Sequence, residues 1–166
     1  MRLPQHYIQP GRTYGAPVNL FIKHKGELVS DTSIELNDLM FTALDYAIGS
    51  IEEAAPLIPF VMVVSKDGNK KLTRFAHELL EKGLEAAQGY IHGEKDNIKT
   101  YTMAWDGFIT IEGKKWDCIF VEAGERGTEQ GVLLAQRYEK KGVFKKKNLP
   151  VGNPALAGHP ISRLGV

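Results

Sequence analysis

Carboxylates near the ends of two consecutive predicted strands come closer to a catalytic pattern than any other residues of this chain. Asp106 follows Trp105 inside an apolar strand, and Glu122 ends the next strand. Glu125 and Arg126 follow it, in a glycine-rich loop. Paired acids at strand ends can transfer protons or bind a cation. These five residues are therefore a candidate ligand-binding site, and a small enzyme or a ligand or cation binder is one hypothesis for function.

The same acids have a structural interpretation, which the pattern favours. Asp106-Gly107 is typical of a bulge or kink within a strand. Glu122 is expected to pair with Arg126 or Arg137, because surface carboxylates are usually solvated or paired. A slip of one residue between the two strands would place Asp106 and Glu122 on opposite faces of the sheet. The chain carries no recognisable catalytic motif, so the balance leans away from an enzyme.

The single cysteine and the histidines offer little to a nucleophile or a metal. Cys118 lies within a strand on the same side as Trp116 and Phe120, where a buried apolar role is expected. No two of the five histidines have His-x-His or His-x-x-x-His spacing, which metal sites on one element use. We therefore predict no metal and no cofactor.

A lysine cluster over residues 140–147 is the second candidate for chemistry. Lys140, Lys141 and three lysines at 145–147 bracket Val143 and Phe144. Lysines contact phosphates, so weak nucleic-acid binding through Lys140–Lys147 is a further alternative function. A nucleic-acid site normally has more aromatic residues than the single one present here. The lysines are therefore more readily interpreted as a solvated run of charge. Nucleic acid is therefore an unexpected partner, whereas the question of a small-molecule partner stays open.

The elements that position these residues follow from hydrophobic spacing. Apolar residues at helical spacing predict helices over residues 33–55 and 77–92, the first with an N-cap at 31–33 and a stop at Pro56. Asp67-Gly68 and Glu112-Gly113 are typical hairpin turns. Two runs, at 60–64 and 132–135, are apolar on both faces, which predicts central strands. The predicted strands cover 60–64, 71–75, 99–111, 115–122 and 132–140, with Met62, Val64, Phe120 and Leu134 nearly fully buried.

This order of elements predicts an α+β fold in which two helices pack on a five-stranded, mostly antiparallel sheet. The simplest sheet places the last strand beside the first, in the order 2-1-5-4-3. The arrangement resembles the topology of roadblock and profilin-like domains over about residues 33–138. No family motif matches residue by residue, so the resemblance implies topology and no function. Other strand orders of an antiparallel sandwich stay open.

Three regions divide the chain. Residues 1–32 are predicted to form an irregular arm with a short hairpin as an option, and residues 33–142 a single α+β domain. Residues 143–166 form a basic tail rich in proline and glycine, which we expect to be irregular and to dock along a surface of this chain or of a partner.

The first predicted helix has a wider apolar arc than contact with one sheet face requires. Phe41, Tyr46 and Ile48 contribute to this width. Either the helix is embedded deeply in the core, or one flank contacts a partner. The second option, together with the missing catalytic motif, gives the leading hypothesis: a small protein-interaction or regulatory module that forms a homodimer or binds a fixed protein partner.

Composition limits the class of protein. With 43% hydrophobic and 25% charged residues over 166 positions, wholesale disorder is excluded. The longest apolar stretches are too short to span a bilayer, and the first residues lack the features of a secretory signal. Together with the single cysteine, these features predict a cytoplasmic protein without a membrane partner, with signal-independent export left open. The net charge of +1 indicates no general preference for polyanions.

Overall fold

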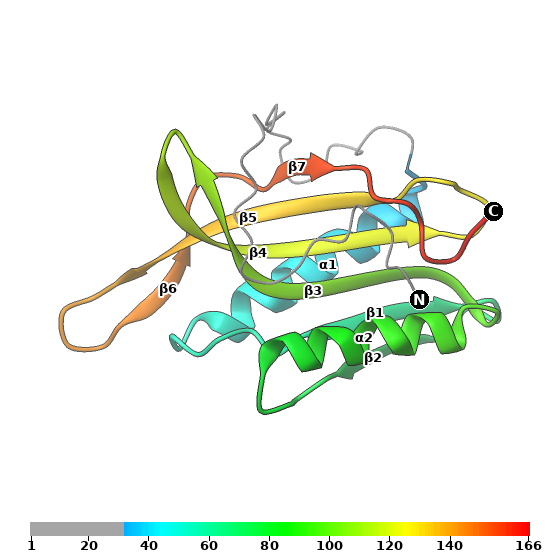
Figure 1. The fold of residues 1–166 in the computed structure, drawn as a ribbon, viewed down its shortest axis with the longest axis horizontal. Coiled ribbons are helices and arrows are strands. Elements are labelled where there is room, and N and C mark those ends of the chain that lie inside the picture. The colour runs from blue at the N-terminus through cyan, green and yellow to red at the C-terminus, as the bar shows by residue number, and fades with distance from the viewer. Residues whose placement is uncertain (1–31) are drawn as a thin grey trace.

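The structure is a computed structural model that describes residues 32–166 (Figure 1). The predicted N-terminal hairpin, and all of the predicted arm except Thr32, lie outside the described residues. Neither helix of the described part has the length and hydrophobicity that crossing a bilayer requires. The elements are α1 (Ile34–Ile51), β1 (Phe60–Ser65), β2 (Lys70–Arg74), α2 (Leu80–Glu94), β3 (Ile98–Ile111), β4 (Lys114–Glu125), β5 (Val132–Lys141), β6 (Lys147–Pro150) and β7 (Ala155–Gly158).

The strands of residues 32–166 form one antiparallel sheet in the order β2-β1-β3-β4-β5-β6, with β7 also paired to β5. The α+β class is confirmed, with seven strands in place of five. The predicted order 2-1-5-4-3 is wrong, because β3 and not β5 pairs with β1. The first half of β3 is buried on both faces, from Tyr101 to Trp105, so β3 qualifies for a central position as well as β5 does.

Two segments of the C-terminal tail, which was expected to be irregular, are strands of the sheet, whereas the residues between and after them are irregular. β6 and β7 both lie along the outer edge of β5, with Tyr138 opposite Pro150 and Leu134 opposite Leu156. Between them the ladder is interrupted, and the buried Gln136 side chain donates to the carbonyl oxygens of residues 151 and 152, both at 3.2 Å. An amide side chain therefore satisfies backbone groups that a continuous strand would have paired.

Helix α1 is closed at both ends by side chains. The Ser33 hydroxyl accepts a hydrogen bond from the Leu36 amide at 3.1 Å, which confirms the predicted N-cap. The helix ends at Ile51, earlier than predicted. There Asn148 of β6 donates from its side chain to the Ile51 carbonyl at 2.9 Å and from its backbone to the Glu52 carbonyl at 3.1 Å. Carbonyl groups left open at the helix end are thus bound by the tail.

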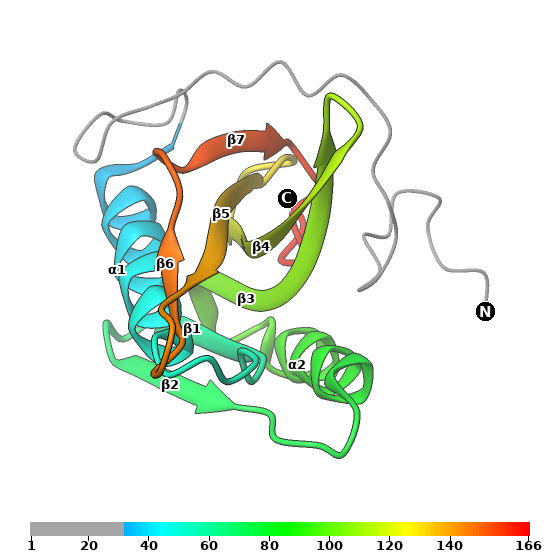
Figure 2. The ribbon, with the colours of Figure 1, turned by 90° about the vertical axis from the view of Figure 1, so that its left-hand side faces the viewer.

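Two apolar clusters cover opposite faces of the sheet. The cluster on the α1 side contains Met62, Val64 and Leu134, and the cluster on the α2 side contains Phe120. All four are between 3% and 8% exposed, as predicted. Helix α2 covers only part of its face, and Figure 2 shows β3 bending so that the tip of the β3–β4 hairpin rises toward β7. This curl brings residues of β3, β5 and β7 around one hollow.

Candidate functional site

The two acids singled out by the sequence lie on opposite faces of the sheet. In the β3–β4 ladder Asp106 is opposite Ile119, and Glu122 is opposite Met103. Ile119 belongs to the α1-side cluster and Met103 to the α2-side cluster. The two carboxylates therefore cannot act together on one substrate, and the geometry gives no support to a paired-acid enzyme.

Asp106 holds the chain that follows α1. Its carboxylate accepts hydrogen bonds from the Tyr138 hydroxyl at 2.9 and 3.0 Å and from the Leu57 amide at 3.4 Å. Burial raises the pKa of Asp106, and these hydrogen bonds only partly oppose the rise. The neighbouring Trp105 is 2% exposed and stacks on Phe120 with 5.6 Å between ring centroids. Asp106 and Trp105 therefore both have structural roles, Asp106 in hydrogen bonds on the α1 side of the sheet and Trp105 in packing on the α2 side.

The raised pKa of Asp106 predicts a pH dependence of stability. A carboxyl group whose pKa is higher in the folded state than in the unfolded state lowers stability as pH rises through the range from about 4 upward. Asp106→Asn removes this contribution, so the variant should gain stability relative to the native protein as pH rises from about 4 to 7. Urea unfolding at several pH values measures the difference. The exposed Asp96→Asn is the control, and a difference that is independent of pH would contradict the expectation.

Glu122 belongs to a buried network with the C-terminal segment. It accepts a hydrogen bond from the Tyr101 hydroxyl at 2.9 Å, and Arg163 donates to its two oxygens at 2.6 and 2.9 Å. The arginine comes from the tail and not from position 126 or 137, which are the partners that the sequence suggested. Burial is also the main cause that raises the pKa of Tyr101. The network fixes the end of the chain to the α2 side of the sheet.

Glu125, the last residue of β4, and Arg126, which follows it, also serve the fold. Arg126 donates from Nε to the Ile98 carbonyl at 3.1 Å and from its guanidinium to the Lys95 carbonyl. Glu125 accepts from the Ser33 amide at 3.2 Å, just before α1. Glu125 thus joins the end of β4 to the start of α1, and Arg126 joins the loop after β4 to the end of α2. Neither lies beside Asp106.

The residues predicted to contact a partner pack within the chain. Phe41 is 8% exposed. Tyr46 and Ile48 are half-buried against the α1-side cluster, and the Tyr46 ring meets Phe60 edge-on at 4.9 Å. Deep embedding, the first of the two options that the sequence left open, accounts for Phe41, and contact with a partner remains a prediction for Tyr46 and Ile48.

Cys118 and the histidines form no reactive site in the part of the chain that the structure describes. Cys118 is fully buried, and burial raises the pKa of its thiol, which opposes formation of the nucleophilic thiolate. Among residues 32–166 no group of three His, Cys, Asp or Glu side chains is placed to hold a metal ion.

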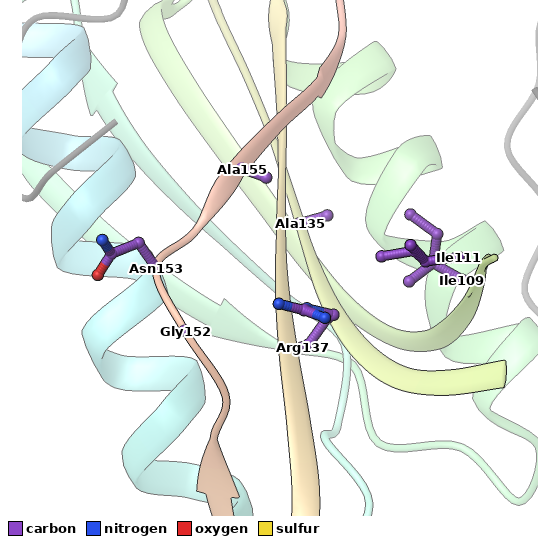
Figure 3. Close-up of a pocket in the computed structure, with 7 residues that line it drawn as sticks. All are labelled: Ile109, Ile111, Ala135, Arg137, Gly152, Asn153 and Ala155. Carbon is purple, nitrogen blue, oxygen red and sulfur yellow. The ribbon is translucent and has the colours of Figure 1, made fainter. Parts of the chain in front are cut away.

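A pocket lies in the hollow of the curled sheet (Figure 3). Ile109 and Ile111 line one side, and the interrupted edge between β6 and β7 lines the other. Its volume is about 90 Å³. Mouths of curled or closed sheets are common ligand sites. The lining residues are Ile109, Ile111, Ala135, Arg137, Gly152, Asn153 and Ala155.

Arg137 is the charged residue among those that line this pocket. The side chain is half-buried, and no carboxylate of the described residues forms an ion pair with it. Its guanidinium lies 4.9 Å from the centre of the Trp116 ring, over which Lys114 also lies, at 3.6 Å. A Cβ atom at Gly152 would come within 3.3 Å of a guanidinium nitrogen. The glycine thus lets the backbone approach a cation that forms no ion pair with residues 32–166.

The sequence-based reasoning missed this pocket as a site. Arg137 follows Leu133 and Ala135 on one side of β5, so alternation alone places it at the end of an apolar face. Its other neighbours come from the curl of β3 and from Gly152 in the tail, which was expected to be irregular. The alternation of residues in β5 was the one feature of this pocket that the sequence could indicate.

No protein-family model matches this chain, and comparisons with curated proteins and with solved structures gave no match. No activity of a relative can therefore be transferred to it.

Proposed function

We propose that the protein is a small regulatory binding module that takes a small organic anion, with a carboxylate and a short apolar chain, in the Arg137 pocket. The observation that carries the proposal is an arginine without a carboxylate partner among the described residues, at the mouth of an apolar pocket. A cytoplasmic location belongs to the same proposal and is supported by the single cysteine, which excludes an internal disulfide.

The shape of the pocket favours a small ligand. The volume of about 90 Å³ is below that of cavities of roughly 150 Å³ that accept benzene. Ile109, Ala135 and Ala155 are at most 7% exposed and supply an apolar floor. A short alkyl chain fits such a floor, and a longer chain would extend into solvent.

The charge of the pocket favours a carboxylate. Arginine presents a planar fork that binds both oxygens of a carboxylate and keeps its charge at every physiological pH. Stacking on Trp116 holds the guanidinium in place. The lining offers no nucleophile and no general base, so the geometry supports binding and not turnover.

Titration of butyrate into the full-length protein tests the proposal. We expect saturable shifts of the Gly152 and Arg137 amide signals in nitrogen–proton NMR spectra. Propionate should bind about fourfold more weakly, since each buried methylene contributes about 0.8 kcal/mol. Arg137→Gln should weaken binding of butyrate by roughly 10–100-fold, the range for loss of a charge-assisted hydrogen bond. Arg137→Lys should bind butyrate more weakly than the native protein and more tightly than Arg137→Gln. Lysine keeps the positive charge but cannot bind both carboxylate oxygens in a fork.

Two controls make the result specific. Arg74→Gln removes an exposed arginine from β2, far along the sheet order from β5, and should leave butyrate binding unchanged. Butylamine has a similar chain without the negative charge and should not bind. Equal binding of butyrate and butylamine, or unchanged binding to Arg137→Gln, would contradict the proposal.

The self-association expected from the sequence remains a prediction. The burial of Phe41 leaves the half-exposed Tyr46 and Ile48 as the part of that surface still open to a partner. At the free edge of the sheet, Lys70, Lys71 and Arg74 of β2 are exposed. Charged side chains of this kind oppose the addition of a strand from a second copy.

A further inference from the structure

The β5–β6 hairpin carries two exposed apolar side chains at its tip. Val143 is 88% and Phe144 102% exposed, the highest values among the large exposed apolar residues of β5 and β6 and their loop. Figure 1 shows this hairpin extending away from the body of the molecule, past the ends of both helices. An exposed aromatic side chain at a projecting tip costs solvation free energy unless it has a contact to make.

The base of the hairpin is fixed to the rest of the molecule. The backbone and side chain of Asn148 bind the last carbonyls of α1, and Asn148 itself is 3% exposed. Lys147 forms an ion pair with Glu52 at 2.7 Å. The strands are in register up to the pair Lys141 and Lys147. The tip is thus held out by a fixed base, which reduces the ordering cost of a contact.

The positive charge of the hairpin is concentrated at this tip. Lys141 pairs with Glu139 at 2.8 Å, so two of the five lysines already have acidic partners. Lys140, Lys145 and Lys146 form no ion pair with the described residues. Lys145 and Lys146 directly follow Val143 and Phe144 in the tip, whereas Lys140 lies opposite Asn148 at the base, where the carboxylates also lie.

From this arrangement we infer that the β5–β6 tip binds the surface of an anionic lipid bilayer. Phe144 and Val143 would enter the interface, and Lys145 and Lys146 would contact the headgroups. Aromatic residues prefer the interface between headgroups and acyl chains, and lysines near an anionic leaflet each add attraction. This contact is peripheral, so it departs from the sequence-based expectation of no membrane partner, which considered spanning segments and a signal peptide.

The position of the acids favours a bilayer over a nucleic acid. An extended polyanion follows a basic groove along several phosphates. Here Glu52, Glu53 and Glu139 lie around the base of the hairpin, and the first two contribute to the raised pKa of Lys147. They would repel a strand that continued past the tip. A flat anionic surface meets only the tip and avoids them.

Co-sedimentation of the full-length protein with vesicles tests the inference. The vesicles contain phosphatidylcholine alone or with about a third phosphatidylserine. We expect binding to the anionic vesicles only, and its loss when salt is raised to about 0.5 M. Phe144→Ser should weaken binding by about tenfold or more. Lys145→Gln with Lys146→Gln should weaken it by about 25-fold, since each lysine contributes about fivefold.

Matched variants separate the tip from net charge and general hydrophobicity. Lys70→Gln with Lys71→Gln removes the same charge from β2, and Leu79→Ser removes an apolar side chain that is 60% exposed. Both should bind vesicles like the native protein. If Phe144→Ser proves unfolded by circular dichroism, Val143→Ser replaces it. Absence of binding to anionic vesicles, equal binding to neutral ones, or tighter tip-dependent binding to a single-stranded oligonucleotide would overturn the inference.

Discussion

Replacement of Arg163 by methionine is expected to lower the free energy of unfolding by about 3–5 kcal/mol. The side chain of Glu122 is 4% exposed, and Arg163 donates to both of its oxygens, at 2.6 and 2.9 Å. Methionine keeps much of the apolar length but leaves a buried carboxylate that accepts a hydrogen bond from the Tyr101 hydroxyl and has lost its positive partner. Urea unfolding monitored by circular dichroism measures the loss.

A second substitution distinguishes loss of the ion pair from loss of packing. Glu122→Leu in the Arg163→Met background removes the isolated charge, so the double variant should be more stable than Arg163→Met alone. Lys82→Met breaks an ion pair with Glu85 whose side chains are 61% and 58% exposed, and a loss of at most about 1 kcal/mol is expected there. If Arg163→Met and Lys82→Met had equal effects, the buried network would have no special role in stability.

Substitution of Val63 by aspartate is expected to abolish cooperative unfolding. Val63 is 5% exposed in β1 and belongs to the cluster that contains Leu84 and Ile91 of α2. An unpaired charge at this place costs about 3–5 kcal/mol. Added to the lost packing, this is a large part of the roughly 5–15 kcal/mol that stabilises a typical domain.

The matched control for Val63→Asp is Lys70→Asp, which places the same side chain at an exposed position of the neighbouring strand β2. It should leave the melting temperature within a few degrees of the native value, on the scale of surface substitutions of about 0.5 kcal/mol. A soluble Val63→Asp protein with an unchanged melting temperature would remove β1 from the interior of the sheet.

The extents of the elements were predictable because local spacing determines them. The two helices and the strands β1 to β5 end within a few residues of their predicted limits, and Glu112-Gly113 forms the predicted turn with positive φ at both residues. Strand order was not predictable in this way. It depends on which strand pairs with the edge of β1 that β2 leaves open, and both β3 and β5 are apolar enough for that place.

The tail was misjudged because its composition is typical of loops. Pro150 lies in β6 and Gly152 in the interruption after it. Proline is tolerated at a sheet edge, where its missing N–H is not needed by a further strand. The sequence pointed to the acids at the strand ends, but it did not indicate which side chains form hydrogen bonds with them. Glu122 depends on Arg163, and the Arg137 pocket depends on Gly152, which only the docked tail brings into place.

The pairing of the tail along β5 has a consequence for proteolysis. The loop between β5 and β6 is exposed and contains Lys145 and Lys146, so it is an accessible site for a trypsin-like protease. Once cut and released, the tail would leave the outer edge of β5 with unpaired N–H and C=O groups beside Leu133, Leu134 and Ala135, and would leave the end of α1 without Asn148. An open apolar edge of this kind templates strand addition from other chains. Cleavage in this loop, followed by release of the tail, would therefore expose an edge of β5 that can seed aggregation.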